Sequence, residues 1–148
     1  MEKALSNIRI IDMTHNQAGP ACAQILGFLG ADVIKLEEPK GGDIARQNMR
    51  DKNSDSLFFL LFNANKRSLT LNLKTSRGKE LFKELIAKSD VLVENFSPGA
   101  LDRLGLGWDT LSKVNPRLIY ATIKGSAATA RTPISRATNR WRRRWAAR

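Results

Sequence analysis

Short apolar segments alternate with helical segments along most of the chain, and this alternation limits the possible fold more than any other feature. The expected strands are residues 8–13, 31–37, 68–73, 90–96 and 118–125. The expected helices begin near residues 20, 43, 55, 76, 97 and 107. A strand that is followed by a helix and another strand forms a βαβ unit, in which the two strands are parallel. The sequence therefore predicts the α/β class, with a Rossmann-like, largely parallel sheet and helices on its faces.

Residues at the expected helix ends support this assignment. Pro20 suits the first turn of a helix, because its fixed φ fits there and its missing N–H would have no partner. Gly30 stands where a left-handed residue commonly closes a helix. Asp43 is expected to cap a short helix, and Thr75 or Ser76 to cap a longer one. Three apolar residues are expected to share the face of that longer helix: Leu81, Leu85 and Ile86.

The composition is that of a globular protein of 148 residues, which is long enough for one domain with a substantial core. No segment is long and apolar enough to cross a bilayer, and the N-terminus lacks the basic-then-apolar layout of a signal peptide. Cys22 is the only cysteine, so the sequence predicts neither an internal disulfide nor a metal site. We expect it to be a small buried side chain, and we expect a cytoplasmic protein without a membrane partner.

The formal net charge of +11 is concentrated near one end of the chain. Of the 25 Lys and Arg residues, seven lie within residues 126–148, which contain no Asp or Glu. The other residues hold 18 basic and 14 acidic side chains, a net charge of only +4. Seven Arg residues with two Trp residues among them could bind nucleic acid or another anionic surface by phosphate contacts and stacking. This binding is one functional hypothesis, and an enzymatic activity is the other.

Ligands of an open parallel sheet bind beyond the carboxyl ends of its strands. The expected sheet brings a mixture of amides, cations and apolar groups to that edge: His15, Gln17, Lys40, Lys74, Asn95, Phe96 and Arg103. Together with the glycine turns, this mixture suits a phosphorylated and partly apolar ligand. The expected first strand is not followed by GxGxxG, and the P-loop and HExxH motifs are absent from the sequence. Dinucleotide, P-loop and zinc-protease sites therefore lack their signatures.

These side chains also have purely structural interpretations. His15 has no carboxylate partner that the sequence identifies, so a hydrogen-bonded loop residue is favoured over a catalytic base. Gln17 could close a turn, and Arg103 could form a surface ion pair of little energetic value. Residues 65–68, NKRS, are expected to be an ordinary polar entry to a strand, unless Lys66 and Arg67 reach a phosphate.

Several long blocks together resemble the class III CoA-transferases, the CaiB/BaiF type. They read DMTHNQAGPACAQILGFLGADVIKLE, GGDIAR, DSLFFLLFNANKRSLTLNLKT, DVLVENFSPGALDRLGLG and NPRLIYATIKG, and they extend almost without gaps from residue 8 to residue 125. Within this family the likeness is greatest to the formyl-CoA:oxalate branch, because of the loop around Gln17 and the segment DKNSDSL. Members similar to α-methylacyl-CoA racemases or to carnitine-type CoA-transferases are the alternatives.

The resemblance implies an enzyme that moves CoA from an acyl-CoA to a carboxylic acid. Members of the family are interlocked homodimers, and an aspartate carboxylate carries the acyl group and CoA in covalent intermediates. Fixed hydrogen-bond donors stabilise the oxyanions that form on the way. Coenzyme A is a substrate, and the resemblance implies no resident cofactor, no metal and no specific nucleic acid.

The family's CoA-contacting positions can be matched residue by residue. Gln17 and Ala18 match the loop that lines CoA and the reacting acyl group. Arg103 matches a phosphate-binding arginine, a role that suits the paired donors of a guanidinium. Two further stretches match positions along the nucleotide and the pantetheine: Leu71, Asn72, Leu73 and Lys74, and Asn95, Phe96 and Ser97.

Two residues depart from the family pattern near this expected site. Asn16 stands where formyl-CoA transferases usually have an apolar residue. Glu38 stands where they usually have an arginine near the ligand's phosphates, which an acid would repel. Lys40 is the nearest residue that could compensate for this charge.

The last 23 residues form the largest departure. After residue 125 the family continues with a segment like GFGSDGPY, whereas this chain continues SAATARTPISR. Codons for residues from Ser126 onward, regrouped one nucleotide out of phase, are compatible with the expected family segment. We therefore expect residues 1–125 to be the N-terminal part of the family's large domain. Residues 126–148 are expected to be an unstructured, out-of-frame basic tail. The nucleophilic aspartate is then missing, and the chain alone is expected to be inactive.

Overall fold

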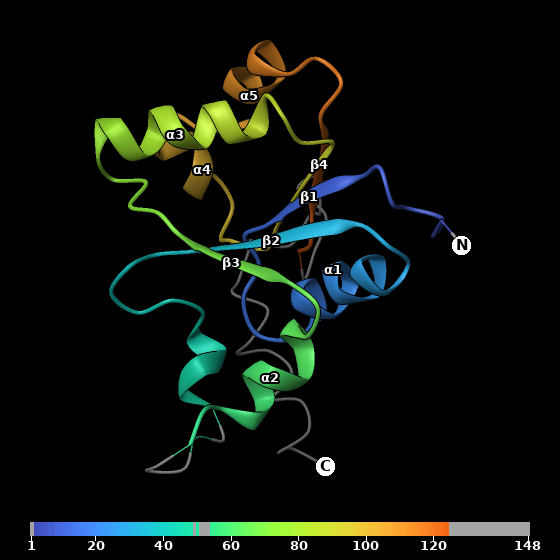
Figure 1. Ribbon diagram of the computed structural model, residues 1–148. Helices are drawn as coiled ribbons and strands as arrows, with labels where there is room; N and C mark the ends of the chain where they lie inside the picture. Colours follow the sequence, from blue (N-terminus) through green and yellow to red (C-terminus); the bar gives the residue numbers. More distant parts are fainter. Residues whose placement is uncertain (1, 49, 51–53, 125–148) are drawn as a thin grey trace, which may run out of the picture.

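The computed structural model describes residues 2–48, 50 and 54–124, and these form a single α/β unit (Figure 1). Its five strands are β1 (Arg9–Asp12), β2 (Asp32–Glu37), β3 (Arg67–Thr70), β4 (Val91–Glu94) and β5 (Ile119–Thr122). They form one sheet in the order β3-β2-β1-β4-β5, and every neighbouring pair is parallel. The predicted α/β class and parallel sheet are confirmed. The expected basic tail lies outside the described residues.

Helices cover both faces of this sheet. The helices α1 (Ala18–Phe28) and α2 (Leu57–Asn63) lie on one side, with the short 3-10 helix η1 (Ile44–Gln47) next to α2. On the other side lie α3 (Ser76–Ile86), α4 (Ala100–Arg103) and α5 (Trp108–Val114) (Figure 1). None of the described helices has the length and apolar character needed to cross a membrane.

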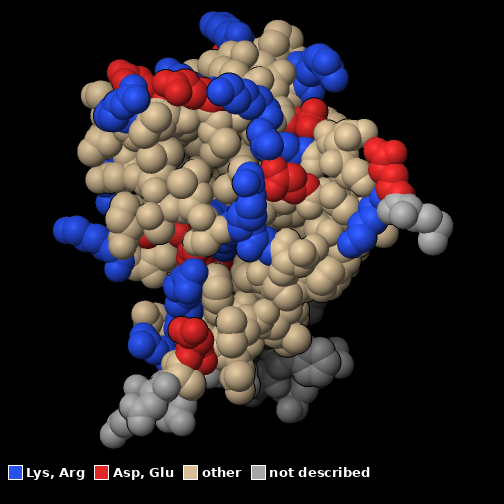
Figure 2. Space-filling model, viewed as in Figure 1, with Lys and Arg blue, Asp and Glu red and all other residues tan. Residues whose placement is uncertain are grey.

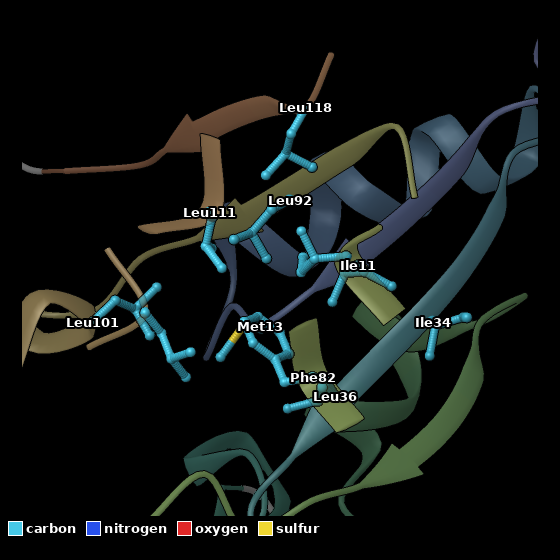
Figure 3. Close-up of a cluster of buried hydrophobic side chains, with 11 residues drawn as sticks. Ile11, Met13, Ile34, Leu36, Phe82, Leu92, Leu101, Leu111 and Leu118 are labelled. Atoms are coloured by element: carbon cyan, nitrogen blue, oxygen red, sulfur yellow. The ribbon is translucent and has the colours of Figure 1, made fainter. Parts of the chain in front are cut away.

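The alternation of side chains along the strands divides the core into two parts. Ile10 in β1 and Val33 in β2 pack with Ala23 of α1 on one face of the sheet. Their neighbours in sequence point to the other face, as the pleat of a strand requires. There the larger core joins α3, α4 and α5 to the sheet, and its side chains converge in Figure 3: Ile11, Met13, Ile34, Leu36, Phe82, Leu92, Leu101, Leu111 and Leu118.

Most of the expected helix ends are confirmed. Asp43 accepts a hydrogen bond from the N–H of Ala45 at the start of η1, and Thr75 accepts one from the N–H of Gly78 at the start of α3. Gly30 has a φ of 112°, the left-handed backbone expected after α1. Such a residue favours glycine because a Cβ is strained there.

Two expectations about burial were wrong. Cys22 is exposed, because the buried face of α1 consists of Gly19, Pro20, Ala23 and Gly27. In α3 the buried large side chains are Phe82 and Ile86, whereas Leu81 is 36% exposed. Phe82 is apolar and four residues before Ile86, so it occupies the face that the pattern of leucines assigned to Leu81.

The strand order creates a reversal in the sheet at β1. The chain passes from β1 outward through β2 to β3, and α3 then carries it back to β4 on the other side of β1. The carboxyl ends of β1 and β4 are therefore adjacent but continue into different helices. A reversal of this kind leaves a crevice at the carboxyl edge, where open α/β sheets commonly bind ligands.

Candidate functional site

A cavity of about 360 Å³ opens at the carboxyl edge of the sheet. Its walls come from the segments that follow β1, β2, β3 and β4, and from the helix α4. The lining is mostly apolar, and its polar or charged members are His15, Glu37, Glu38, Asn72 and Lys74. The apolar members Met13, Leu36 and Leu101 belong to the larger core. A cavity with apolar walls and a few polar groups is typical of small-molecule sites.

Five of the ten residues matched to CoA contacts line this cavity. They are Leu71, Asn72, Leu73, Lys74 and Phe96. The sequence separates Phe96 from the other four by more than twenty residues, and the fold brings all five to the same cavity. Their contact with CoA stays a prediction.

The other five matched residues lie outside the lining of this cavity. Gln17 and Ala18 are exposed at the start of α1, where Gln17 is the residue before the first turn and makes no side-chain cap. Ser97 and Arg103 are exposed, and the Arg103 guanidinium lies 3.4 Å from the carbonyl oxygen of Pro98. Asn95 is half-buried and is bound to the loop that follows β1.

The segment from Leu71 to Lys74 is held by a hydrogen bond to β2 and by a hydrogen bond within the segment. The Leu71 N–H donates to the carbonyl of Glu37 at 2.9 Å, which continues the pairing of β3 with β2 for one residue. The side chain of Asn72 then accepts from the N–H of Lys74 at 3.0 Å. This asparagine turn ends the strand and directs the chain into α3.

Asn95 connects the loop after β1 to the end of β4. Its side-chain oxygen accepts from the N–H of His15 at 2.8 Å, and its side-chain nitrogen donates to the carbonyl of His15 at 2.8 Å. The His15 ring also lies against Phe96, with the ring centroids 5.3 Å apart. Asn95 thus acts as a clamp between the backbone of the loop after β1 and the end of β4.

A buried pair that sequence reasoning missed joins Lys66 to Asp12 at the end of β1. The ammonium of Lys66 donates to Oδ2 of Asp12 at 2.8 Å, and the two side chains are 1% and 0% exposed. The same ammonium also donates to the carbonyl of Pro20 and to Oδ1 of Asn63, each at 2.9 Å. Burial lowers the pKa of Lys66, and Asp12 offsets part of this effect. Lys66 directly precedes β3, as expected for an entry to this strand, and its buried ammonium does not extend toward a surface phosphate.

A second buried pair joins Lys35 to Asp43. Lys35 donates to Oδ2 of Asp43 at 2.9 Å and to the carbonyl of Thr14, from a position where its side chain is 3% exposed. Oδ1 of Asp43 accepts from the N–H groups of Asn16 at 3.0 Å and Ala45 at 2.9 Å. Burial by itself would raise the pKa of Asp43, but these donors and the nearby His15 hold it well below its usual range.

Glu37 closes the turn between β2 and η1. Its Oε1 accepts from the N–H of Asp43 at 2.7 Å, and Arg46 binds both carboxylate oxygens at 2.8 and 2.7 Å. The guanidinium of Arg46 also lies 3.8 Å from the ring centroid of Phe59 in α2. Burial raises the pKa of Glu37, but the hydrogen bonds from Arg46 and Asp43 outweigh burial and lower it overall.

The sequence held a partial signal for these buried pairs. Lys35 stands inside a strand whose other residues are mostly apolar, and a charged residue there requires a partner. Asp12 ends the first strand in the same way. The sequence could not identify the partners, because only the folded chain brings Lys66 to Asp12 and Asp43 to Lys35.

The structure places the two departures from the family pattern differently, because Glu38 lines the cavity and Asn16 does not. Glu38 is exposed, so its carboxylate is accessible at the cavity. Lys40 is exposed and does not belong to the lining residues. No group of three or more His, Cys, Asp or Glu side chains within the described ranges is arranged to hold a metal ion. Lys and Arg side chains on the face seen in Figure 2 lie interspersed with Asp and Glu.

A family match and the similarity to curated proteins indicate the same family. The family described as CoA-transferase family III matches residues 5–133. A curated formyl-CoA:oxalate CoA-transferase of Streptomyces avermitilis is 59% identical over 126 residues, which is 84% of this chain and 31% of that protein. The chain thus spans about a third of the length of the curated relatives that it matches.

Solved structures share the fold of this segment. A hypothetical protein of Mycobacterium tuberculosis is 39% identical, with a TM-score of 0.81 over 90% of this chain and 37% of that one. A CaiB/BaiF family protein of Brucella suis is 37% identical, with a TM-score of 0.80 over 88% of this chain and 35% of that one. The sequence blocks, the parallel sheet and these matches agree, and the chain belongs to CoA-transferase family III.

Proposed function

We propose that this chain is the N-terminal part of an enzyme that moves CoA between formyl-CoA and oxalate. The observation that carries the proposal is the cavity, because residues matched to CoA contacts at two distant places in the sequence line it together. The identity of 59% to a formyl-CoA:oxalate CoA-transferase supports the choice of substrates. We further propose that the nucleophilic aspartate lies outside this chain, which alone does not turn over.

The lining suggests how the parts of CoA would be bound. Leu71, Leu73 and Phe96 offer apolar surface to the pantetheine arm, while Asn72 offers an amide. Lys74, at the same rim, supplies a positive charge for a phosphate. Glu38 opposes this charge and lowers the expected affinity for a phosphorylated ligand. The chain's own part is to bind and orient CoA, and the covalent steps belong to the aspartate.

The remaining parts of the proposal follow the family. The intact enzyme is a homodimer in the cytoplasm, with acyl-CoA and a carboxylic acid as its substrates. It needs no resident cofactor or metal. Residues 1–125 are the N-terminal part of the large domain, and residues 126–148 are an out-of-frame tail without a selected partner.

A chimera tests the substrates directly. Residues 1–124 of this chain would replace the matching segment of the Streptomyces avermitilis enzyme, and the purified chimera would be given formyl-CoA and oxalate. We expect oxalyl-CoA to form, measured by chromatography, at a rate within about tenfold of the parent enzyme, because 59% identity preserves most contacts. Turnover of a different acyl-CoA without any oxalyl-CoA would favour the racemase-like or carnitine-type alternative.

Binding by the chain itself tests the cavity. Calorimetry with free CoA should show weak binding by the natural chain, and Lys74→Ala should weaken it by about tenfold, as expected for one lost charge contact with a phosphate. Lys79→Ala is the matched control, because Lys79 lies outside the cavity lining. Equal binding by both variants would place the phosphates elsewhere.

A further inference from the structure

His15 has a ring nitrogen that the structure leaves unpaired in a buried position. Nδ1 is inaccessible to solvent and makes no hydrogen bond among the described residues. A carboxylate oxygen, Oδ1 of Asp43, lies 3.5 Å from this nitrogen. This distance is long for a hydrogen bond. The contact can still become one, because catalytic and binding hydrogen bonds often shorten when a ligand is bound.

The position of the ring is set by the residues around it. Asn95 binds both the N–H and the carbonyl of His15, and Phe96 packs against the ring. The side chain is 26% exposed, and it lines the cavity. Since Nδ1 is buried, the exposed part of the side chain comes from its other atoms, which include Nε2.

Asp43 can only accept hydrogen bonds from its neighbours. It is fully buried, and its other contacts are with the ammonium of Lys35 and the N–H groups of Asn16 and Ala45, all of which are donors. These donors keep the carboxylate ionised. A neutral imidazole next to an ionised carboxylate is most stable with its proton on the nitrogen that faces the carboxylate. The other nitrogen is then a hydrogen-bond acceptor.

We propose that Asp43 is a positioning residue that holds His15 with its proton on Nδ1, so that Nε2 offers a hydrogen-bond acceptor to the ligand in the cavity. The ligand group recognised there is a donor, such as the hydroxyl, an amide N–H or the thiol of CoA, and this part rests on the proposed function. Neither the sequence pattern nor the family likeness assigns this role to Asp43.

Asp43 also fixes the backbone next to His15. Its Oδ1 accepts from the N–H of Asn16, which has a φ of 66°. This left-handed backbone is uncommon in residues other than glycine, although asparagine tolerates it better than most. Asn16 comes directly before Gln17, so the same carboxylate positions the imidazole and the residue that leads into α1.

The single histidine of the chain makes the proposal directly measurable. Tag-free protein labelled with ¹⁵N in its histidine would give imidazole resonances from His15 alone. Long-range ¹H–¹⁵N spectra distinguish the two neutral tautomers from each other and from the doubly protonated ring. We expect the Nδ1–H form to be the major one. A predominant Nε2–H form in the natural chain would overturn the proposal without any variant.

A pair of variants tests whether Asp43 is the cause. In folded Asp43→Ala the fraction of the Nδ1–H form should fall by at least about twofold, because the carboxylate that favours it is gone. Asp32→Ala is the matched control. Asp32 is the first residue of β2, at the end of the strand away from His15, so this substitution should leave the tautomer unchanged. An unchanged tautomer in folded Asp43→Ala would reject Asp43 as the positioning group. If this variant does not fold, the tautomer of the natural chain decides.

Adding CoA separates this inference from the proposed function. We expect CoA to shift the Nε2 resonance while the proton stays on Nδ1. CoA binding that leaves the Nε2 resonance unchanged would overturn the acceptor role. If CoA does not bind and the Nδ1–H form is still the major one, the proposed function fails while the pairing of Asp43 with His15 stands.

Discussion

The buried ammonium of Lys66 donates hydrogen bonds to three oxygen atoms. Lys66→Met keeps most of its volume but leaves the fully buried carboxylate of Asp12 without its main partner. Lys35 is the next cation, and its ammonium is 3.9 Å from that carboxylate. Loss of one member of a buried pair is strongly destabilising, so we expect the free energy of unfolding to fall by about 3 kcal/mol. Urea titration followed by circular dichroism would measure it.

The control for this substitution is Lys88→Met at an exposed position. It should change the free energy of unfolding by no more than about 0.5 kcal/mol. If Lys66→Met were equally harmless, the carboxylate of Asp12 would have to be protonated or otherwise paired. The buried pair described above would then be wrong.

Glu37 should make the stability of the protein depend on pH. Its pKa is lower in the folded chain than the ordinary value of 4.5, so its stabilising contribution is complete above that pH. The contribution is lost as the pH falls through the lowered pKa of the folded state. Glu37→Gln should therefore be less stable than the natural chain at pH 7, and the difference should shrink below about pH 4.5.

Urea titrations at several pH values would measure this difference. Glu84→Gln is the control, because the side chain of Glu84 is 63% exposed. Its difference from the natural chain should stay small at every pH. A gap between natural chain and Glu37→Gln that stays constant down to pH 3 would contradict the lowered pKa.

At the scale of residues, the sequence predicted local roles well and distant ones poorly. Asp43 was expected to cap a helix, and it does, because a cap needs only the next few residues. Its contacts with Lys35, His15 and Asn16 depend on the fold of three separate segments. The sequence could therefore not assign a carboxylate partner to His15, and the structure corrects this by placing Asp43 beside it.

At the scale of elements, α3 packs against the cavity wall, because Gly78 lies close to the backbone of Asn72. A Cβ at this position would overlap the carbonyl oxygen of Asn72, which lines the cavity. Alanine favours a helix over glycine by about 1 kcal/mol, but overlap with backbone atoms costs up to about 3 kcal/mol. We therefore expect Gly78→Ala to lower the free energy of unfolding by about 2 kcal/mol and to weaken CoA binding. Urea titration and calorimetry would measure the two effects.

Ser76→Ala is the control for Gly78→Ala, because Ser76 is exposed in the first turn of the same helix. It should leave both quantities nearly unchanged. A gain of stability in Gly78→Ala would mean that helix propensity dominates and that α3 can move away from Asn72. The close contact would then not determine the shape of the wall.

Element type was predictable from sequence, but element ends were less so. The strand expected at residues 68–73 is β3, Arg67–Thr70. Alternation of apolar and polar residues continues through Leu71 and Leu73, and these side chains do pack against the core, although β3 ends at Thr70 and its pairing with β2 continues only through the Leu71 N–H. The turn made by Asn72 ends the pairing. This local hydrogen bond competes with strand pairing, and the alternation of apolar residues does not predict it.

At the scale of the whole molecule, charge divides the chain into two parts. The sequence before residue 126 has 18 basic and 14 acidic side chains, while the last 23 residues have seven Arg and no acid. Figure 2 shows mixed charges on one face of the described part. The parallel fold and the family could be predicted because long blocks of the sequence are typical of both. The basic segment lies outside the described residues.

This division gives a test of the nucleic-acid hypothesis. The full chain should bind single-stranded RNA weakly, and a chain that ends at residue 125 should lose that binding. Each phosphate contact with single-stranded nucleic acid contributes about 0.7 to the slope of log affinity against log salt, so seven arginines allow a slope of about −5 at most. Fluorescence anisotropy at several salt concentrations would measure the affinity and the slope for both chains.

CoA binding by the two chains completes the comparison. Because the described residues that line the cavity all come before residue 105, we expect removal of residues 126–148 to leave the affinity for CoA within about twofold of its original value. RNA binding that survives the truncation would assign a nucleic-acid surface to the folded part and count against the enzymatic proposal. Loss of CoA binding on truncation would instead mean that the basic segment contributes to the ligand site, since its arginines are suited to phosphate groups.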